Sequence, residues 1–281
     1  MRIIRYRSSA GNEEMAEEHT DGRITRLNGT LFSGLTRTAD ALSKDETADR
    51  LAPLEPTALF CIGLNYRQHA AETNAALPRF PVLFMKSTAA LQHPGQPIVL
   101  PRFLHSSKVD YEAELAVVVG RTCKNVRREE AMSYVFGYIC ANDVSARDWQ
   151  KEGGGSQWSR GKSFDTFAPL GPCLVTADEI ENPHALRIRT VVSGETLQDC
   201  STGDMVFDIP TLIEFLSGST TLLPGTVILT GTPHGVGMAR TPPRFLKPGD
   251  LVTVEIDRIG ALANPVFEEV SDTSSDFALP K

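Results

Sequence analysis

Three acidic side chains offer the clearest chemistry in this sequence. Glu112 and Glu114 lie two residues apart in Val109–Gly120, an apolar run whose alternation predicts a half-buried strand. Side chains two apart on a strand share a face, so these carboxylates would repel each other unless a positive charge lay between them. Asp143, within ANDVSARD, is the nearest further carboxylate that could join them. Because the three offer only oxygen, they predict a Mg²⁺, Mn²⁺ or Ca²⁺ site rather than a zinc site.

A histidine and a glutamate form a second candidate group. Residues 66–74 predict a short helix on which His69 and Glu72 lie one turn apart on one face. A carboxylate in that position can orient an imidazole and raise its basicity, which would let it act as a general base. By itself, this spacing of His69 and Glu72 is also typical of a pair on the protein surface. In the same way, Glu112 and Glu114 by themselves are also typical of the solvated face of a strand.

Further polar residues follow Asp143. Arg147 could hold a carboxylate with its planar guanidinium, and Gln150 lies one helical turn further on. Lys162 precedes an apolar strand, where a partly buried lysine could stabilise an oxyanion or enolate. The loop TGTPHGVG, residues 230–237, is rich in small residues that let backbone amides approach a ligand closely. It matches neither a P-loop nor a dinucleotide-binding fingerprint.

Composition narrows the class of protein. The chain has 281 residues, 41% hydrophobic and 22% charged, which is ordinary for a globular protein with one large core. The net charge of −7 argues against general binding to nucleic acid or to anionic membranes. No apolar run is long enough to span a bilayer, and the N-terminus has no secretory signal, so we expect a cytoplasmic protein. The five cysteines form no CxxC pair and predict neither a zinc site nor a disulfide framework.

The first 56 residues predict a small N-terminal domain. MRIIRY and RITRLN have the composition of short strands, and the charged stretch 8–22 between them is expected to be a loop. Residues 35–50 could include a short helix. Pro53 and Pro56 then interrupt the chain, which places the boundary between an N-terminal domain, 1–56, and a main domain, 57–281.

The main domain is expected to be mostly β. Strands outnumber helices and do not alternate with them, so the pattern disfavours a doubly wound α/β sheet. A helix is expected at 208–217, with Asp208 as its N-cap. The run GGGSQW, 153–158, suits a mobile loop. Strands are expected at 58–66, where the strand runs into a loop, and at 82–87, 109–120, 136–143 and 226–230, and hairpins are expected at 186–200 and 251–267.

Seven segments together resemble the fumarylacetoacetate hydrolase family, in the branch of acylpyruvate hydrolases, oxaloacetate decarboxylases and 2-hydroxyhepta-2,4-diene-1,7-dioate isomerases. They cover about residues 57–270 in the family's order. One ExE pair is weak support, whereas the ordered set is specific. The segments are IGLNYRQHAAE, PVLFMKSTAAL, VDYEAELAVVVG, NDVSARDWQ, GKSFDTFAPLGP, LLPGTVILTGTPHGVG and FLKPGDLVTVEIDRIGALANPV.

The resemblance implies a fold and a role for each candidate residue. The fold would be the family's mixed β-sandwich roll with a small N-terminal domain, and the protein would be a homodimer. One position departs from some acylpyruvate hydrolases, which have arginine where this chain has Leu64. The implied roles are Mg²⁺ or Mn²⁺ binding by Glu112, Glu114 and Asp143, catalysis by His69, Glu72 and Lys162, and substrate binding by Arg147, Gln150 and Thr232.

Three functions remain open at this stage. The first expectation is a metal-dependent hydrolase that cleaves a C–C bond of a β-diketo acid, an acylpyruvate such as fumarylpyruvate, through an enolate. The alternative keeps the site but decarboxylates oxaloacetate or isomerises a 2-hydroxy-diene dioate. A non-catalytic binding protein on this fold is disfavoured, because the candidate ligands, the lysine and the His–Glu pair are all present.

Overall fold

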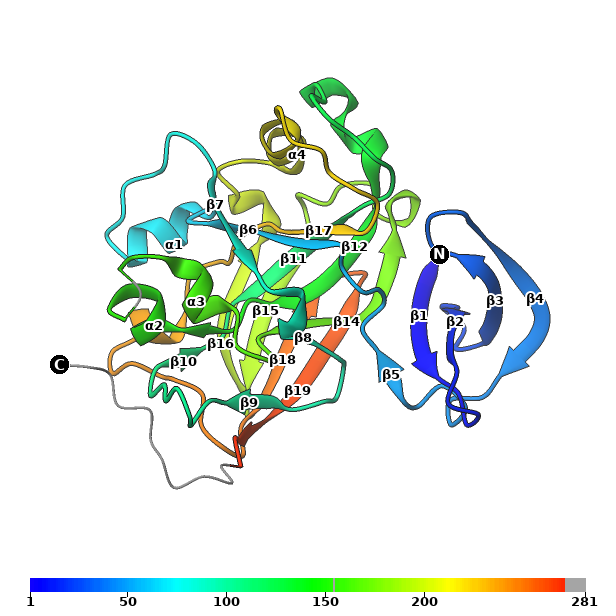
Figure 1. Ribbon diagram of the computed structural model, residues 1–281, viewed down its shortest axis with the longest axis horizontal. Helices are drawn as coiled ribbons and strands as arrows, with labels where there is room; N and C mark the ends of the chain where they lie inside the picture. The colour runs from blue at the N-terminus through cyan, green and yellow to red at the C-terminus, as the bar shows by residue number, and fades with distance from the viewer. Residues whose placement is uncertain (154, 271–281) are drawn as a thin grey trace.

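The computed structural model describes residues 1–153 and 155–270 and is built mainly from strands (Figure 1). This confirms the mostly β class that the sequence predicts. Gly154, within the expected mobile loop, lies outside the described residues, as does the end of the main domain beyond 270. The larger sheet contains β1 (Arg2–Arg7), β2 (Glu13–Glu18), β3 (Ile24–Thr30), β4 (Gly34–Leu42), β5 (Arg50–Leu51), β6 (Ala58–Gly63), β7 (Val82–Lys86), β8 (Leu91–Gln92), β11 (Ala113–Val119), β12 (Val135–Asn142), β14 (Ala168–Thr176) and β17 (Thr226–Leu229).

The strands of this sheet follow the order β4-β3-β2-β1-β14-β12-β11-β17-β6-β7. Most neighbours are antiparallel, but β17 runs parallel to β6 and β14 parallel to β8, so the sheet is mixed. A separate five-stranded sheet has the order β16-β15-β18-β19-β9, and β10 pairs with β13. These strands are β9 (Ile98–Leu100), β10 (Val109–Asp110), β13 (Ser145–Ala146), β15 (Arg187–Val192), β16 (Glu195–Ser201), β18 (Leu251–Ile256) and β19 (Gly260–Glu268).

Strand β11 lies at the centre of the fold and is buried on both faces. Leu115 and Val117 belong to one apolar cluster, together with residues of the helix α4 (Ile209–Ser217), while Ala116 and Val118 belong to a second cluster. The predicted half-buried strand over 109–120 is therefore wrong in two respects. A strand covered on both faces has no solvated side, and the run is divided into β10 and β11.

The N-terminal segment contains more strand than its sequence indicates. The expected loop over 8–22 includes β2, and the expected helix over 35–50 is replaced by β4. β2 is the charged segment EEMAEE, whose glutamates are balanced by arginines from β1, β3 and β4: Arg5 pairs with Glu13, Arg26 with Glu14 and Arg37 with Glu17. Such cross-strand pairs stabilise a strand without any local signal in its own sequence.

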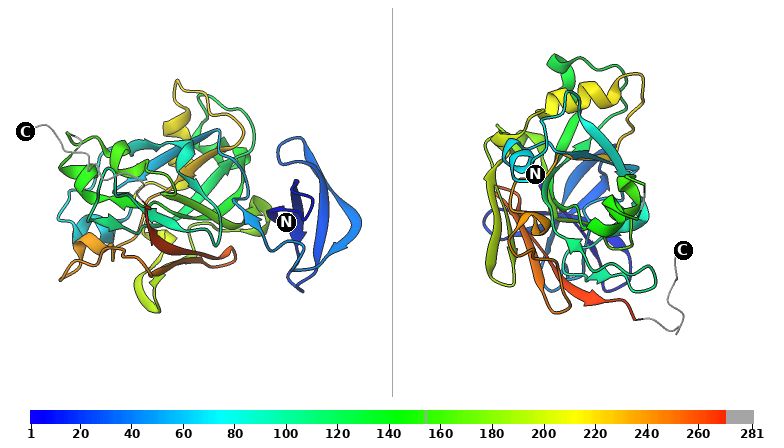
Figure 2. Two further views of the ribbon diagram at one scale, coloured as in Figure 1. Left: turned by 60° about the horizontal axis from the view of Figure 1, so that its bottom comes forward. Right: turned by 90° about the vertical axis from the view of Figure 1, so that its left-hand side faces the viewer.

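The N-terminal strands lie at one end of the molecule (Figures 1 and 2). They nevertheless continue the larger sheet, because β1 pairs with β14 at Arg2↔Val175 and Ile3↔Leu174. The division into domains at residue 56 stays a prediction. At the opposite end, three short helices lie close together: α1 (Arg67–Glu72), α2 (Arg147–Lys151) and α3 (Trp158–Lys162).

Short 3₁₀ helices complete the regular structure. They are η1 (Thr88–Ala90), η2 (Arg128–Tyr134), η3 (Ala177–Glu179), η4 (Thr202–Asp204) and η5 (Gly237–Ala239). In the described ranges, no helix is long and apolar enough to cross a membrane.

Helix α4 begins at the N-cap that the sequence predicts. The Asp208 carboxylate accepts the Thr211 N–H at 3.0 Å and pairs with Arg128. Although partial burial opposes the shift, Arg128 and Thr211 lower the pKa of Asp208 below its ordinary value. We expect Asp208→Ala to lower the free energy of unfolding by about 1 kcal/mol in urea denaturation at neutral pH.

The pH dependence gives this prediction a second test. Because the folded pKa of Asp208 is depressed, its stabilising contribution is complete above the ordinary aspartate value and is lost as the pH falls towards the depressed one. The difference between wild type and Asp208→Ala should therefore shrink in acid. An undiminished difference there would contradict the proposed cap. Glu129→Gln, at an exposed site on η2, is the matched control.

Candidate active site

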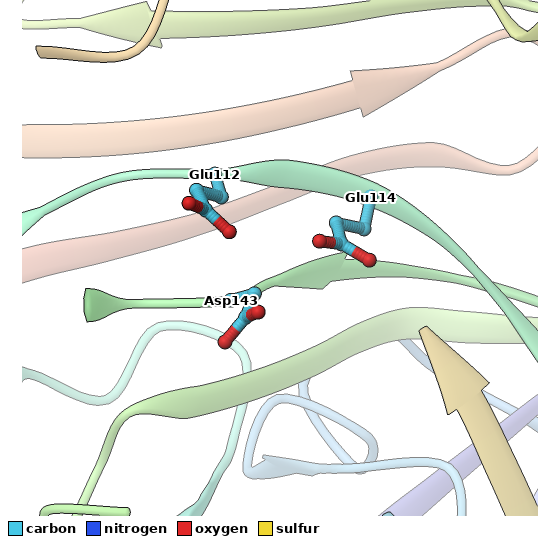
Figure 3. A group of neighbouring side chains, drawn as sticks. All are labelled: Glu112, Glu114 and Asp143. Atoms are coloured by element: carbon cyan, nitrogen blue, oxygen red, sulfur yellow. The ribbon is translucent and has the colours of Figure 1, made fainter. Parts of the chain in front are cut away.

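The three predicted metal-binding carboxylates meet in the structure. Figure 3 shows Glu112 and Glu114 directed from neighbouring positions towards Asp143 on the adjacent strand segment. One oxygen of each lies within 4.8 Å of the others, and all three residues are buried. The register of β11 and β12 creates this meeting, since Ala113 is opposite Asn142 and the Asp143 N–H donates to the Glu112 carbonyl at 2.9 Å.

Two lysines, Lys162 and Lys86, form ion pairs with carboxylates of this cluster. Lys162 Nζ lies 2.7 Å from an oxygen of Glu112 and 2.7 Å from an oxygen of Asp143. Lys86 Nζ lies 2.6 Å from the other Asp143 oxygen and donates to the Val144 carbonyl at 3.0 Å. Although burial would lower it, these carboxylates raise the pKa of Lys162, which therefore remains charged. Lys162 is fully buried rather than partly buried as expected.

Glu114 is the carboxylate that the protein does not balance with a positive charge. Its Oε2 accepts the Gly231 N–H at 2.7 Å, and in the described part of the chain it forms no ion pair with lysine or arginine. Burial, together with the nearby Asp143 and Glu112 carboxylates, raises the pKa of Glu114 well above its ordinary value. A bound cation would remove this imbalance, because it would supply the missing positive charge.

The total charge of the buried groups also favours a bound cation. Four carboxylates and three basic side chains are buried together here, so one negative charge is unbalanced when Glu114 is ionised, the form in which it would bind a cation. The donor atoms are all carboxylate oxygens, the ligand type that Mg²⁺ and Mn²⁺ take in proteins. The carboxylates are Asp110, Glu112, Glu114 and Asp143, and the cations are Lys86, Arg147 and Lys162.

Arg147 is held mainly by carboxylates of the chain. Its Nε donates to Asp110 at 2.9 Å, and its Nη1 lies 2.6 Å from Glu112 and donates to Gln150 Oε1 at 3.0 Å. Its Nη2 is buried and has no hydrogen-bond partner among the described residues. The guanidinium therefore orients Glu112 and Gln150 and leaves one buried donor unpaired among the described residues.

His69 and Glu72 form the expected pair on α1. His69 Nδ1 lies 2.7 Å from one oxygen of Glu72, and the second Glu72 oxygen accepts the Gly235 N–H at 2.8 Å. A carboxylate at Nδ1 favours the tautomer with the proton on that nitrogen, which leaves Nε2 as the basic atom. Because Glu72 is also fixed to the glycine-rich loop, the ring orientation is set from two segments of the chain.

The loop 230–237 uses its glycine amides differently from the sequence-based expectation. Besides Gly231 on Glu114 and Gly235 on Glu72, the Gly237 N–H donates to Asp110 at 2.8 Å. The amides thus approach carboxylates of the chain itself. Gly231 has φ of +101°, and a Cβ atom there would lie 2.7 Å from the Cβ of Asn65, so glycine is required for this approach.

These groups surround one cavity of about 170 Å³. Seven of the nine predicted site residues line it, while Asp143 and Glu72 contact the lining residues Lys162 and His69. Apolar side chains also line the cavity, including Leu64, Phe84, Trp158 and Met238. The lining residues with predicted roles are His69, Glu112, Glu114, Arg147, Gln150, Lys162 and Thr232.

Three important residues received no role from the sequence. Lys86 ends an apolar strand, and a charge in that position is a signal for a buried partner. Asp110 precedes Glu112 by two residues and accepts three backbone N–H groups, those of Tyr111, Gly237 and Met238, in addition to Arg147. Gln198 lies in an ordinary hairpin strand, and no local pattern distinguishes it.

Comparison with known proteins identifies the family. The family model described as fumarylacetoacetate (FAA) hydrolase C-terminal matches residues 58–267. The chain belongs to the fumarylacetoacetate hydrolase family. The resemblance inferred from the ordered motifs is thereby confirmed, and the fold is that of the family's solved structures. The family match and the relatives identify the protein as an enzyme of the fumarylacetoacetate hydrolase family with a small-molecule substrate.

The family relatives indicate the branch. The mitochondrial oxaloacetate tautomerase fahd2 of Xenopus laevis is 51% identical over 238 residues, which span 84% of this chain and 74% of that protein. The human mitochondrial oxaloacetate tautomerase FAHD2A is 47% identical over 217 residues, 77% of this chain and 68% of that protein. A solved 5-carboxymethyl-2-hydroxymuconate delta-isomerase from Mycobacterium smegmatis is 37% identical with a TM-score of 0.83, covering 96% of this chain and all of its own.

Proposed function

We propose that this protein catalyses the keto–enol tautomerisation of a small 2-keto dicarboxylic acid, with oxaloacetate as the first substrate to test. The observation that carries the proposal is that a His–Glu pair and a buried carboxylate–lysine cluster line one cavity. The first would provide proton transfer, and the second would stabilise negative charge through Lys162 and the cation that it would hold. The tautomerase and isomerase names of the relatives support this choice over the acylpyruvate hydrolase expected first.

The proposed proton transfer uses His69. Its Nε2 takes a proton from the carbon beside the ketone, and the electron pair of that C–H bond moves into the enolate. The imidazolium is stabilised by the Glu72 carboxylate 2.7 Å from Nδ1. Return of the proton from Nε2 to the enolate oxygen gives the enol and restores neutral His69. The reverse sequence converts the enol to the keto acid.

The enolate charge is stabilised by the buried cluster. We propose that Glu112, Glu114 and Asp143 hold Mg²⁺ or Mn²⁺, which when bound supplies Lewis-acid stabilisation of negative charge. Lys162 contributes a permanent positive charge in a buried site, where electrostatic interactions are stronger than in water.

Substrate carboxylates are proposed to bind the remaining polar groups of the cavity wall. Arg147 has the unpaired Nη2 donor, and Gln150 and Thr232 also line the cavity. Leu64 adds apolar surface instead of another charge. These contacts would orient the carbon acid towards His69.

C–C bond hydrolysis is the second candidate, because the pair of His69 and Glu72 could also activate water for attack on an acylpyruvate. Both reactions pass through the same enolate. They differ in their products, since hydrolysis releases pyruvate and tautomerisation does not. Decarboxylation of oxaloacetate also releases pyruvate.

The test is an ultraviolet assay of the metal-stripped protein before and after addition of Mg²⁺ or Mn²⁺. We expect metal-restored acceleration of the loss of oxaloacetate enol absorbance, with no more pyruvate in a coupled assay than the same metal produces in buffer. Pyruvate from oxaloacetate above that level would identify a decarboxylase, and pyruvate from acetylpyruvate or fumarylpyruvate would identify the hydrolase. Enol loss at the buffer rate under all conditions would contradict the tautomerase proposal.

Two further expectations stay predictions. The homodimer is checked by the molar mass in solution. The cytoplasmic location is checked by cell fractionation, and the names of the relatives place those proteins in mitochondria.

A further inference from the structure

Gln198, on β16, is buried behind the cavity wall and connects three segments of the chain. Its Oε1 accepts the Ala113 N–H at 2.9 Å and the Thr190 hydroxyl at 2.6 Å. Its Nε2 donates to Thr232 Oγ1 and to the Pro233 carbonyl, both at 2.8 Å. All four hydrogen-bonding positions of the amide are therefore occupied. The side chain is 1% exposed and does not itself line the cavity.

The direction of the Gln198 amide is fixed by its backbone partners. The N–H of Ala113 can only donate, and the carbonyl of Pro233 can only accept, so the amide cannot be reversed. Thr232 Oγ1 must then act as an acceptor towards Gln198. Its own proton is left over, and within the described ranges the Thr232 hydroxyl donates to no other group.

The remaining Thr232 proton has a defined use. Thr232 lines the same cavity as Glu112 and Lys162. Because the Thr232 hydroxyl already accepts a hydrogen bond from Gln198, its proton is oriented for donation to a ligand in the cavity. Preorganised donors of this kind stabilise negative charge without reorganisation.

We infer that Gln198 is a positioning residue that fixes the Thr232 hydroxyl as a hydrogen-bond donor to an anionic oxygen of the ligand, a carboxylate or an enolate. The inference rests on the proposed function insofar as it takes this cavity as the substrate site. Gln198 also holds Ala113, the residue between Glu112 and Glu114, so one side chain sets the spacing between the metal-binding carboxylates and the ligand-binding loop.

A double-mutant cycle tests this role through binding rather than turnover. The probe is oxalate in the presence of saturating Mg²⁺, with the dissociation constant measured by calorimetry at mildly alkaline pH. Gln198→Glu keeps the shape, but its carboxylate would accept the Thr232 proton and turn the donor away from the cavity. We expect oxalate affinity to fall about tenfold or more, the size of a hydrogen bond to a charged group.

The decisive comparison is the Thr232→Val background, which lacks the hydroxyl. There, Gln198→Glu should change oxalate affinity little, because the group through which Gln198 acts is absent. Thr232→Ser should restore the sensitivity to Gln198→Glu. Equal losses in both backgrounds would overturn the inference, since they would show that Gln198 acts only by supporting the fold.

A second variant of Gln198 and a control variant complete the experiment. Gln198→Met removes the amide without adding a charge and should show the same dependence on Thr232, even where Gln198→Glu folds poorly. Gln92→Glu is the matched control, because Gln92 donates to the Pro97 carbonyl and does not line the cavity. Absence of oxalate binding in the wild type would overturn the inference. Binding with the expected coupling but without oxaloacetate turnover would overturn only the proposed reaction.

Discussion

Replacing Glu114 with glutamine is expected to abolish turnover and to weaken metal binding while leaving the metal-free fold intact. The substitution removes one oxygen ligand from a cluster whose members lie within 4.8 Å of one another. Loss of a residue that only supports a ligand typically costs about 10–100-fold in metal affinity, and we expect a direct ligand to cost at least the upper end of that range.

Although Glu114→Gln weakens metal binding, it should not lower the stability of the metal-free protein. In the wild type, burial and the neighbouring carboxylates raise the pKa of Glu114, so its ionised form is unfavourable without a cation. Glutamine removes that charge, and its amide oxygen can still accept the Gly231 N–H. We therefore expect Glu114→Gln to be at least as stable as the wild type without metal, as judged by its Tm.

The measurement is the Tm with and without Mg²⁺ or Mn²⁺. Metal that binds only the folded state raises the Tm of the wild type, and at the same metal concentration this rise should be much smaller in Glu114→Gln. Glu129→Gln, on exposed η2, should keep the full rise. A variant that loses stability without metal yet keeps the metal-dependent rise would show that Glu114 is structural rather than a ligand.

Replacing His69 with alanine is expected to separate catalysis from metal binding. His69 lines the cavity but contributes no oxygen to the carboxylate cluster. Its loss should reduce kcat for tautomerisation about 10²–10⁴-fold, the usual contribution of a positioned general base. Metal-dependent stabilisation and oxalate binding should remain within a few-fold of the wild type.

The controls for His69→Ala use two other positions. Glu72→Gln should reduce kcat by less, because the imidazole remains while its orienting carboxylate is lost. His105→Ala should have no effect, since His105 is exposed and does not line the cavity. Full activity in His69→Ala would exclude the proposed proton transfer and direct attention to Lys162 and Glu112.

The sequence by itself determined those features that depend on short spacing. Glu112 and Glu114 share a side because they are two residues apart, and His69 and Glu72 meet because they are three apart on a helix. The cap of α4 and both C-terminal hairpins follow from similarly local signals. The ordered family motifs identified the remaining site residues, although their roles stay predictions.

Local signals failed where partners come from distant strands. The charged strand β2 and the exposed strand β4 carry no alternation that separates them from a loop or a helix. β11 alternates in composition but is buried on both faces, because a second apolar cluster covers the side on which the glutamates lie. Burial of this kind depends on what packs against a strand and not on the strand itself.

Only the tertiary structure decided which positive charges and hydrogen bonds balance the buried carboxylates of the site. The register of β11 and β12 brings Asp143 to Glu112, and the ends of β7 and α3 bring Lys86 and Lys162 to Asp143. The four hydrogen bonds of Gln198 likewise join segments up to 85 residues apart. Ion pairing and hydrogen-bond direction in a buried site depend on the three-dimensional set of neighbours, which residue spacing along the chain does not contain.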